Sequence, residues 1–191
     1  MSDQNNGASQ GAAAPQGGAQ AGGVQTQGGT QEAPIVIHGQ YIKDLSFESP
    51  HAPAILANIR QSPQLEIQLN VNARPLQPEN RLFEVLLKIR ATAKHQDRVA
   101  FVVELEYGAL VTLGSMIPED RREAVLLIDV ATMIFPFARR TVADVTREGG
   151  FPPVLINPVD FVGLYRQRKA QEQQQNQQGA GDSGPTPVGN A

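Results

Sequence analysis

The stretch that decides the fold is RLFEVLLKIRATAKHQDRVAFVVELEYGALVTLGSM, residues 81–116. Its first half carries apolar side chains at the odd positions 83–93 and mostly polar ones at the even positions, the two-residue period of a strand with one buried face. The second half is again apolar at the odd positions 99–113, with a mixed even set. Because the polar joint HQDR (95–98) separates the two halves, the stretch predicts a long antiparallel hairpin.

Two more strands are predicted before the hairpin. Residues 34–46, PIVIHGQYIKDLS, indicate a strand with Gly39 as a candidate β-bulge. Residues 65–73 alternate apolar odd positions with polar even ones, so they predict a strand with one wet face and one dry face. Between these strands residues 54–60 predict one short helical turn. Pro75 and Pro78 predict that residues 74–80 form a loop.

After residue 116 the apolar period becomes helical. Pro118, with Glu119 and Asp120 behind it, suits a helix amino terminus. Apolar residues then recur at helical spacing up to position 135, on more than one side of the helix. Pro136 predicts the end of this helix and the start of another, which stops at Gly149. A proline-rich loop, 151–159, leads to a last helix.

Four strands followed by helices predict an α+β fold, in which a four-stranded antiparallel sheet carries its helices on one face. The first helix has a second apolar side that this sheet cannot cover, so the sequence predicts self-association. We divide the chain into a disordered Gly/Ala/Gln-rich tail (1–33), a domain (34–169) and a second disordered tail (170–191). Both tails lack the apolar residues whose burial offsets the entropy of folding.

Composition narrows the functional classes. The 191 residues have a formal net charge of -3 and contain no cysteine, which excludes disulfides and thiol catalysis. The mildly acidic balance argues against nucleic acid as a partner. Without a signal peptide or an apolar run of membrane length, the sequence predicts a cytoplasmic protein that does not insert into membranes.

The titratable residues indicate neither a metal site nor an enzyme. The three histidines lie far apart, and nucleotide-binding and nucleophile motifs are absent, so we expect no metal and no cofactor. Glu104 and Glu106 share a strand face and could form an acid–base pair, but a solvated sheet surface explains them better. A small-ligand enzyme, the alternative from another class, would need a polar pocket under the helices.

Apolar residues in irregular backbone suggest a different function. Residues 151–159, FPPVLINPV, and the joint 134–137, IFPF, place aliphatic and aromatic groups where a groove could accept apolar side chains of another polypeptide. The same loop could instead pack over its own sheet and close the core. The sequence leaves both interpretations open.

Four stretches resemble, in this order and spacing, the SecB family of bacterial protein-export chaperones: YIKDLSFESPHAP (41–53), AFVVELEYGAL (100–110), IFPFAR (134–139) and GGFPPVLINPVDF (149–161). The resemblance covers nearly the whole predicted domain, and the long amino-terminal tail departs from it. It implies a cytoplasmic homotetramer, a dimer of dimers. This assembly would bind unfolded preproteins, keep them translocation-competent and deliver them to the export ATPase SecA without a cofactor. A related chaperone dedicated to a single partner, such as an antitoxin, is the alternative.

The resemblance also assigns residues to three roles. SecA would dock on the acidic outer face of the sheet, at Asp44, Glu48, Val102 and Glu104. Tetramer assembly would depend on Val103, Leu105 and Tyr107, to which we add Leu127 from the doubly apolar helix. The client groove would involve Phe101, Phe135, Phe137, Phe151 and Leu155.

Overall fold

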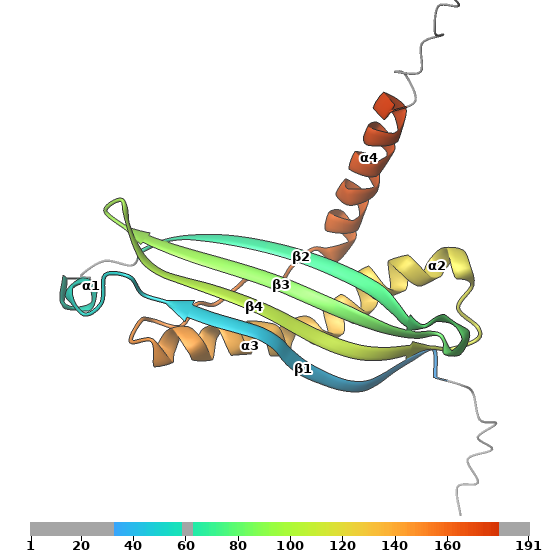
Figure 1. Cartoon of the computed structure of the whole chain (residues 1–191), viewed down its shortest axis with the longest axis horizontal. Helices are drawn as coiled ribbons and strands as arrows, with labels where there is room; N and C mark the ends of the chain where they lie inside the picture. The colour runs from blue at the N-terminus through green and yellow to red at the C-terminus, as the bar shows by residue number, and fades with distance from the viewer. Residues whose placement is uncertain (1–32, 59–62, 180–191) are drawn as a thin grey trace, which may run out of the picture. The chain divides into compact units, whose positions relative to one another are not determined.

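The computed structural model describes residues 33–58 and 63–179. Apart from Ala33, the predicted amino-terminal tail lies outside these ranges, as do residues 180–191 of the predicted carboxyl-terminal tail. The described residues form a four-stranded sheet with helices, so the predicted α+β fold is confirmed (Figure 1).

All neighbouring strands of the sheet are antiparallel, in the order β1-β4-β3-β2 (Figure 1). Their bounds are Ile35–Glu48 for β1, Gln64–Gln77 for β2, Leu82–His95 for β3 and Arg98–Leu113 for β4. The two central strands are therefore the halves of the predicted hairpin. Gln96 and Asp97 join them with positive φ angles of 47° and 62°, a tight turn whose twist suits the sheet.

Both edge strands are less regular than the central pair. In β1 the register against β4 shifts between Ile37 and Gly39, which confirms the bulge predicted at the glycine. The prediction that residues 74–80 form a loop is wrong in part, because β2 continues to Gln77 and only Pro78–Asn80 form the short 3-10 turn η1. Pro75 is tolerated because β2 is an edge strand, where a missing N–H can face away from the sheet.

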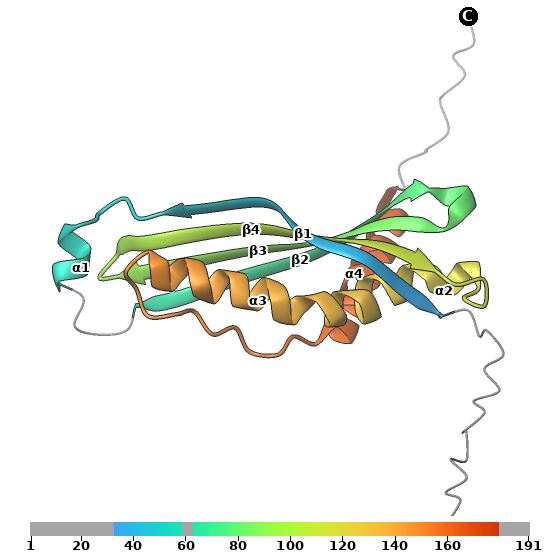
Figure 2. The same cartoon turned by 90° about the horizontal axis from the view of Figure 1, so that it is seen from below.

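A helical segment crosses one face of the sheet (Figure 2). It comprises α2 (Glu119–Ala124), the π-helical turn η2 (Val125–Val130) and α3 (Ala131–Glu148). The helix end predicted at Pro136 is wrong, since α3 runs through this residue. Pro136 and Thr132 are both exposed, so the Thr132 carbonyl that loses its N–H partner can bond to water instead.

The core lies between this helical segment and the sheet. The odd-numbered side chains of β3 and β4 are buried there, from Phe83 to Ala93 and from Phe101 to Leu113, as the two-residue period predicted. Buried side chains from the helices complete the core, among them Leu126, Val130, Ile134, Ala138 and Val142. The opposite side of the sheet, which we call the outer face, carries the even-numbered side chains of β3 and β4.

Two further helices complete the fold: α1 follows β1, and α4 follows the segment after α3. The short α1 (Ala54–Asn58) confirms the described part of the turn predicted at 54–60. The crossover segment, residues 149–160, leads from α3 to α4 (Phe161–Gly179). Because α4 continues past residue 169, residues 170–179 are helical and do not begin a disordered tail. Among the described helices, none combines the length and hydropathy required to span a membrane.

Candidate functional site

The four predicted docking residues, Asp44, Glu48, Val102 and Glu104, lie together on the outer face of the sheet. Glu48 is directly opposite Val102 in the β1–β4 ladder, and Asp44 is opposite Glu106. Opposite residues of an antiparallel pair point to the same face, and Glu104 shares that face because it lies between Val102 and Glu106 at the two-residue period. The fold therefore brings all four residues onto one surface, while their role remains a prediction.

The acidic side chains of this surface have basic neighbours on β3. Lys88 forms an ion pair with Glu106, and Arg90 forms one with Glu104. Both pairs are partly exposed, so each contributes at most about 1 kcal/mol, and a cationic partner could displace Lys88 or Arg90 at small cost. Together with Asp44, these side chains line a shallow depression of about 400 Å3.

A second polar group of the outer face, the Glu84 cluster (Tyr41, Lys43, Arg74 and Glu84), was not predicted. Glu84 is only 4% exposed. It accepts hydrogen bonds from Tyr41 Oη at 2.5 Å, from Lys43 Nζ at 3.1 Å and from Arg74 Nε. Arg74, followed by Tyr41 and Lys43, holds the pKa of the Glu84 carboxyl down to about 2 despite its burial. Burial and the bond to Glu84 raise the pKa of Tyr41 to about 12.

One sequence signal for this cluster existed. Gly108 lies inside β4, and glycine within a strand often marks the close approach of another group. A Cβ at this position would be 2.6 Å from Tyr41 Cζ, so the tyrosine ring lies over the glycine backbone. The sequence alone gave no means of choosing Tyr41 or Glu84 as the approaching group, because the pairing of β1 with β4 decides it.

The five residues predicted for the client groove do not form one exposed surface. Phe101, Phe135 and Phe151 are buried in the core, whereas Phe137 is 51% exposed and Leu155 is 75% exposed. The buried rings pack in two places: Phe101 contacts Phe151 with centroids 4.8 Å apart, and Phe135 contacts Phe161 at 5.7 Å. The groove prediction therefore keeps support only at Phe137 and Leu155.

The crossover segment is held along α3, as Figure 2 shows. The hydroxyl of Thr146 is completely buried, donates to the Val142 carbonyl at 3.0 Å and accepts a hydrogen bond from the Val154 N–H at 3.0 Å. Arg139 donates to the Ile156 carbonyl at 3.3 Å. Both interpretations of this loop thus hold in part, because Phe151, Val154 and Ile156 close the core while Leu155 faces solvent.

The four residues predicted to govern assembly are buried inside the chain itself. Val103, Leu105 and Tyr107 belong to the helix-covered side of β4, and Leu127 of η2 is buried as well. They therefore do not form an exposed surface in this conformation, and their role in assembly stays a prediction. Other apolar side chains are exposed and could meet a copy, among them Val36, Ile42 and Leu45 on β1 and Leu65 and Ile67 on β2.

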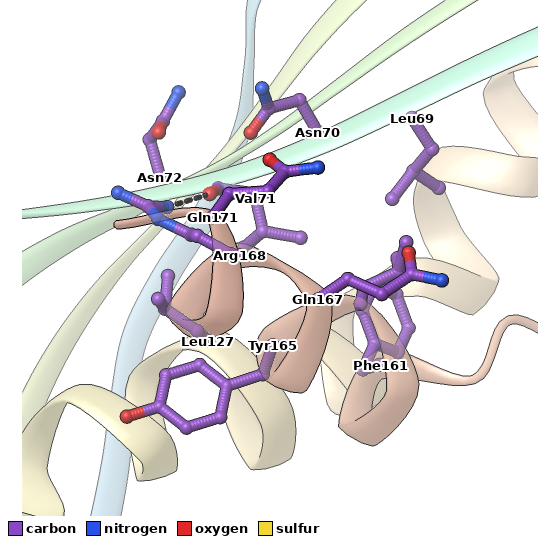
Figure 3. Close-up of a pocket in the computed structure, with 11 residues that line it drawn as sticks. Leu69, Asn70, Val71, Asn72, Leu127, Phe161, Tyr165, Gln167, Arg168 and Gln171 are labelled. Atoms are coloured by element: carbon purple, nitrogen blue, oxygen red, sulfur yellow. Dashed lines mark hydrogen bonds between the residues drawn. The ribbon is translucent and has the colours of Figure 1, made fainter. Parts of the chain in front are cut away.

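A pocket of about 350 Å3 lies between α4 and the β2 edge (Figure 3). Arg168 spans it and donates to the Val71 carbonyl at 3.0 Å. Its other polar lining consists of the Tyr165 phenol and of amide side chains from both elements, Asn70, Asn72, Gln167 and Gln171. This lining includes no carboxylate and no histidine that could act with Tyr165 as an acid–base pair, so this pocket does not support the small-ligand enzyme. Within residues 33–58 and 63–179, no three His, Cys, Asp or Glu side chains could together hold a metal ion.

Comparison of the sequence with known proteins gives one family. The family model described as preprotein translocase subunit SecB matches residues 28–172. The protein-export protein SecB of Parvibaculum lavamentivorans is 45% identical over 174 residues, which are 90% of this chain and 94% of that protein. The protein-export protein SecB of Granulibacter bethesdensis is 46% identical over 148 residues, 74% of this chain and 86% of that protein.

Among solved structures, the chain is similar to a SecB-like chaperone of Mycobacterium tuberculosis in complex with a peptide from the HigA1 antitoxin. The TM-score is 0.57 and the sequence identity is 15%, over 66% of this chain and 91% of that one. At this identity the likeness shows a shared fold.

Proposed function

Because the chain belongs to the SecB family, we propose that it binds unfolded preproteins on the helix-covered side of its sheet and delivers them to SecA through the outer face. Membership of this family identifies the chain as a chaperone of preprotein export. The observation that supports two separate surfaces is their position: Phe137 and Leu155 are exposed along α3 and the crossover segment, whereas Asp44 and Glu104 lie across the sheet from them.

Exposed apolar side chains on the helix-covered side of the sheet support client binding there. Met133 and Phe137 are exposed on one side of α3, and Leu155 extends from the crossover segment held against the same helix. Burying apolar surface contributes about 25 cal/mol per Å2 before the cost of ordering the client. Because a single chain offers only a few such side chains, useful affinity requires several sites on one assembly.

The assembly we propose is a cytoplasmic homotetramer, a dimer of dimers. β1 is an edge strand whose exposed Val36, Ile42 and Leu45 would suit pairing with a second copy. The native mass should then be four times the chain mass of 20.6 kDa, and native mass spectrometry that finds only a monomer would refute this arrangement.

SecA would recognise the outer face through its carboxylates. Glu104→Lys breaks the ion pair with Arg90 and places two cations side by side, so we expect SecA affinity to fall at least about tenfold. The ability to delay refolding of a denatured preprotein should remain. Glu79→Lys, an equal charge change in the exposed turn η1 outside the strands, is the matched control. Loss of SecA binding and client binding together in Glu104→Lys would contradict the separation of the two surfaces.

A chaperone dedicated to one partner is the second candidate, since the similar solved structure is a SecB-like chaperone bound to an antitoxin peptide. Identities of about 45% to proteins named for export favour the general function. Pull-down of many unrelated precursors by the purified chain would support the export role, and capture of one protein alone would support the dedicated one.

A further inference from the structure

The Glu84 cluster ties three strands together across the outer face. Tyr41 and Lys43 come from β1, Glu84 from β3 and Arg74 from β2. β4 lies between β1 and β3, so the two β1 side chains must reach over it to meet the carboxylate. They can do so because Gly108 of β4, directly opposite Tyr41, has no side chain to block the ring.

The cluster lies beside a second irregularity of β1. Tyr41 pairs with Gly108 and Ile42 with Tyr107, but the next pair is Asp44 with Glu106, so Lys43 is an extra residue in the ladder. Tyr41 is odd and Asp44 is even, and in a regular strand they would point to opposite faces. The bulge at Lys43 turns Asp44 onto the outer face beside Glu106, and the later even residues of β1 up to Glu48 follow it.

We propose that the Glu84 cluster is a positioning device for the docking surface. By holding Tyr41 and Lys43 on both sides of Ile42, it fixes the bulge and thereby the register that presents Asp44 and Glu48 outward. Without this hold, the irregular edge strand β1 loosens from β4 beyond the bulge. The proposal rests on the docking function proposed for this face, and it adds Glu84, Tyr41 and Gly108 as residues that act through Asp44 and Glu48.

Two independent variants test it in the full chain. Glu84→Gln removes the carboxylate, and Gly108→Ala places a methyl group 2.6 Å from Tyr41 Cζ, which forces the ring away while Glu84 stays intact. Tyr41→Phe removes the hydrogen bond from Tyr41 to Glu84 and leaves the net charge and the aromatic ring unchanged. Glu66→Gln, which removes one exposed carboxylate from β2, is the matched control for net charge.

The first measurement is hydrogen exchange of the backbone amides from 42 to 48. Glu84→Gln and Gly108→Ala should speed this exchange at least about tenfold relative to the wild type and Glu66→Gln. Tyr41→Phe should change it in the same direction by a smaller factor. Unchanged exchange in both Glu84→Gln and Gly108→Ala would overturn the proposal.

The second measurement is SecA affinity, with delayed refolding of a denatured preprotein as the internal control. The variants that loosen β1 should bind SecA about fivefold to tenfold more weakly while still delaying refolding. Faster exchange with unchanged SecA affinity would also overturn the positioning role. If the wild type did not bind SecA, the docking function would fail on its own, and the exchange of residues 42–48 would still decide whether the cluster fixes the bulge.

Discussion

The buried carboxylate of Glu84 should make the stability of the fold depend on acidic pH. Its pKa falls from an ordinary value of 4.5 to about 2 in the folded chain, chiefly through the hydrogen bond from Arg74. A depressed carboxyl pKa contributes stability that is fully present above the unfolded value and is lost as pH falls through the folded value. The contribution should therefore be complete above about pH 5 and absent near pH 2.

The expected size follows from the shift. A change from 4.5 to about 2, at 1.36 kcal/mol per pKa unit, corresponds to roughly 3 kcal/mol at neutral pH. Glu84→Gln should therefore lower the free energy of unfolding by roughly 3 kcal/mol at pH 7, with a difference from the wild type that shrinks toward zero near pH 2. Arg74 and Lys43 are partly exposed, so water can hydrate their charges once Glu84 is replaced. The loss of unfolding free energy therefore does not include the cost of leaving these two charges buried without a partner.

Urea unfolding of the wild type and Glu84→Gln between pH 2 and pH 7 measures this difference. All samples should have one protein concentration, because self-association makes stability depend on it. Glu66→Gln controls for net charge and should follow the wild type, since Glu66 is exposed. A wild-type minus Glu84→Gln difference that stays constant with pH would refute the reasoning, because the loss would then come from packing rather than from the ionised carboxyl.

Three further predictions concern the helix side. Thr146→Val leaves the buried Val154 N–H without its acceptor, so chemical denaturation should show a loss of about 1–3 kcal/mol, whereas Thr146→Ser should keep most of the stability; equal losses in the two would contradict the hydrogen-bond argument. Leu155→Ser changes a side chain that is 75% exposed, so the unfolding free energy should shift by no more than about 0.5 kcal/mol while refolding of a denatured preprotein is delayed less; full retention of that delay would exclude Leu155 from client binding. Gly149→Ala puts a methyl group into the space of the Phe47 ring, so thermal unfolding should show a cost of about 1–3 kcal/mol, and an unchanged melting temperature would show that the ring moves freely.

On the helix-covered side of the sheet, the sequence does not determine which apolar side chains are buried and which are exposed. The sequence identifies the residues of the predicted groove as apolar, but their exposure depends on which other segments cover them. Phe151 is buried because it meets Phe101 from β4, whereas Leu155, four residues later, extends into solvent. Proline also interrupts this chain less than its sequence pattern predicts. Pro75 lies in an edge strand and Pro136 on the exposed side of α3, where a missing N–H costs little.

The sequence by itself determined the hairpin of β3 and β4, its polar turn, and the division of their side chains between the two faces of the sheet. It could do so because strand period and turn chemistry are local, and each depends on residues close together in the chain. Only the tertiary structure decided that Glu84 is buried among Tyr41, Lys43 and Arg74, and that a bulge turns Asp44 outward. These features depend on the register between strands far apart in the sequence, which packing over the whole sheet sets and no local pattern specifies.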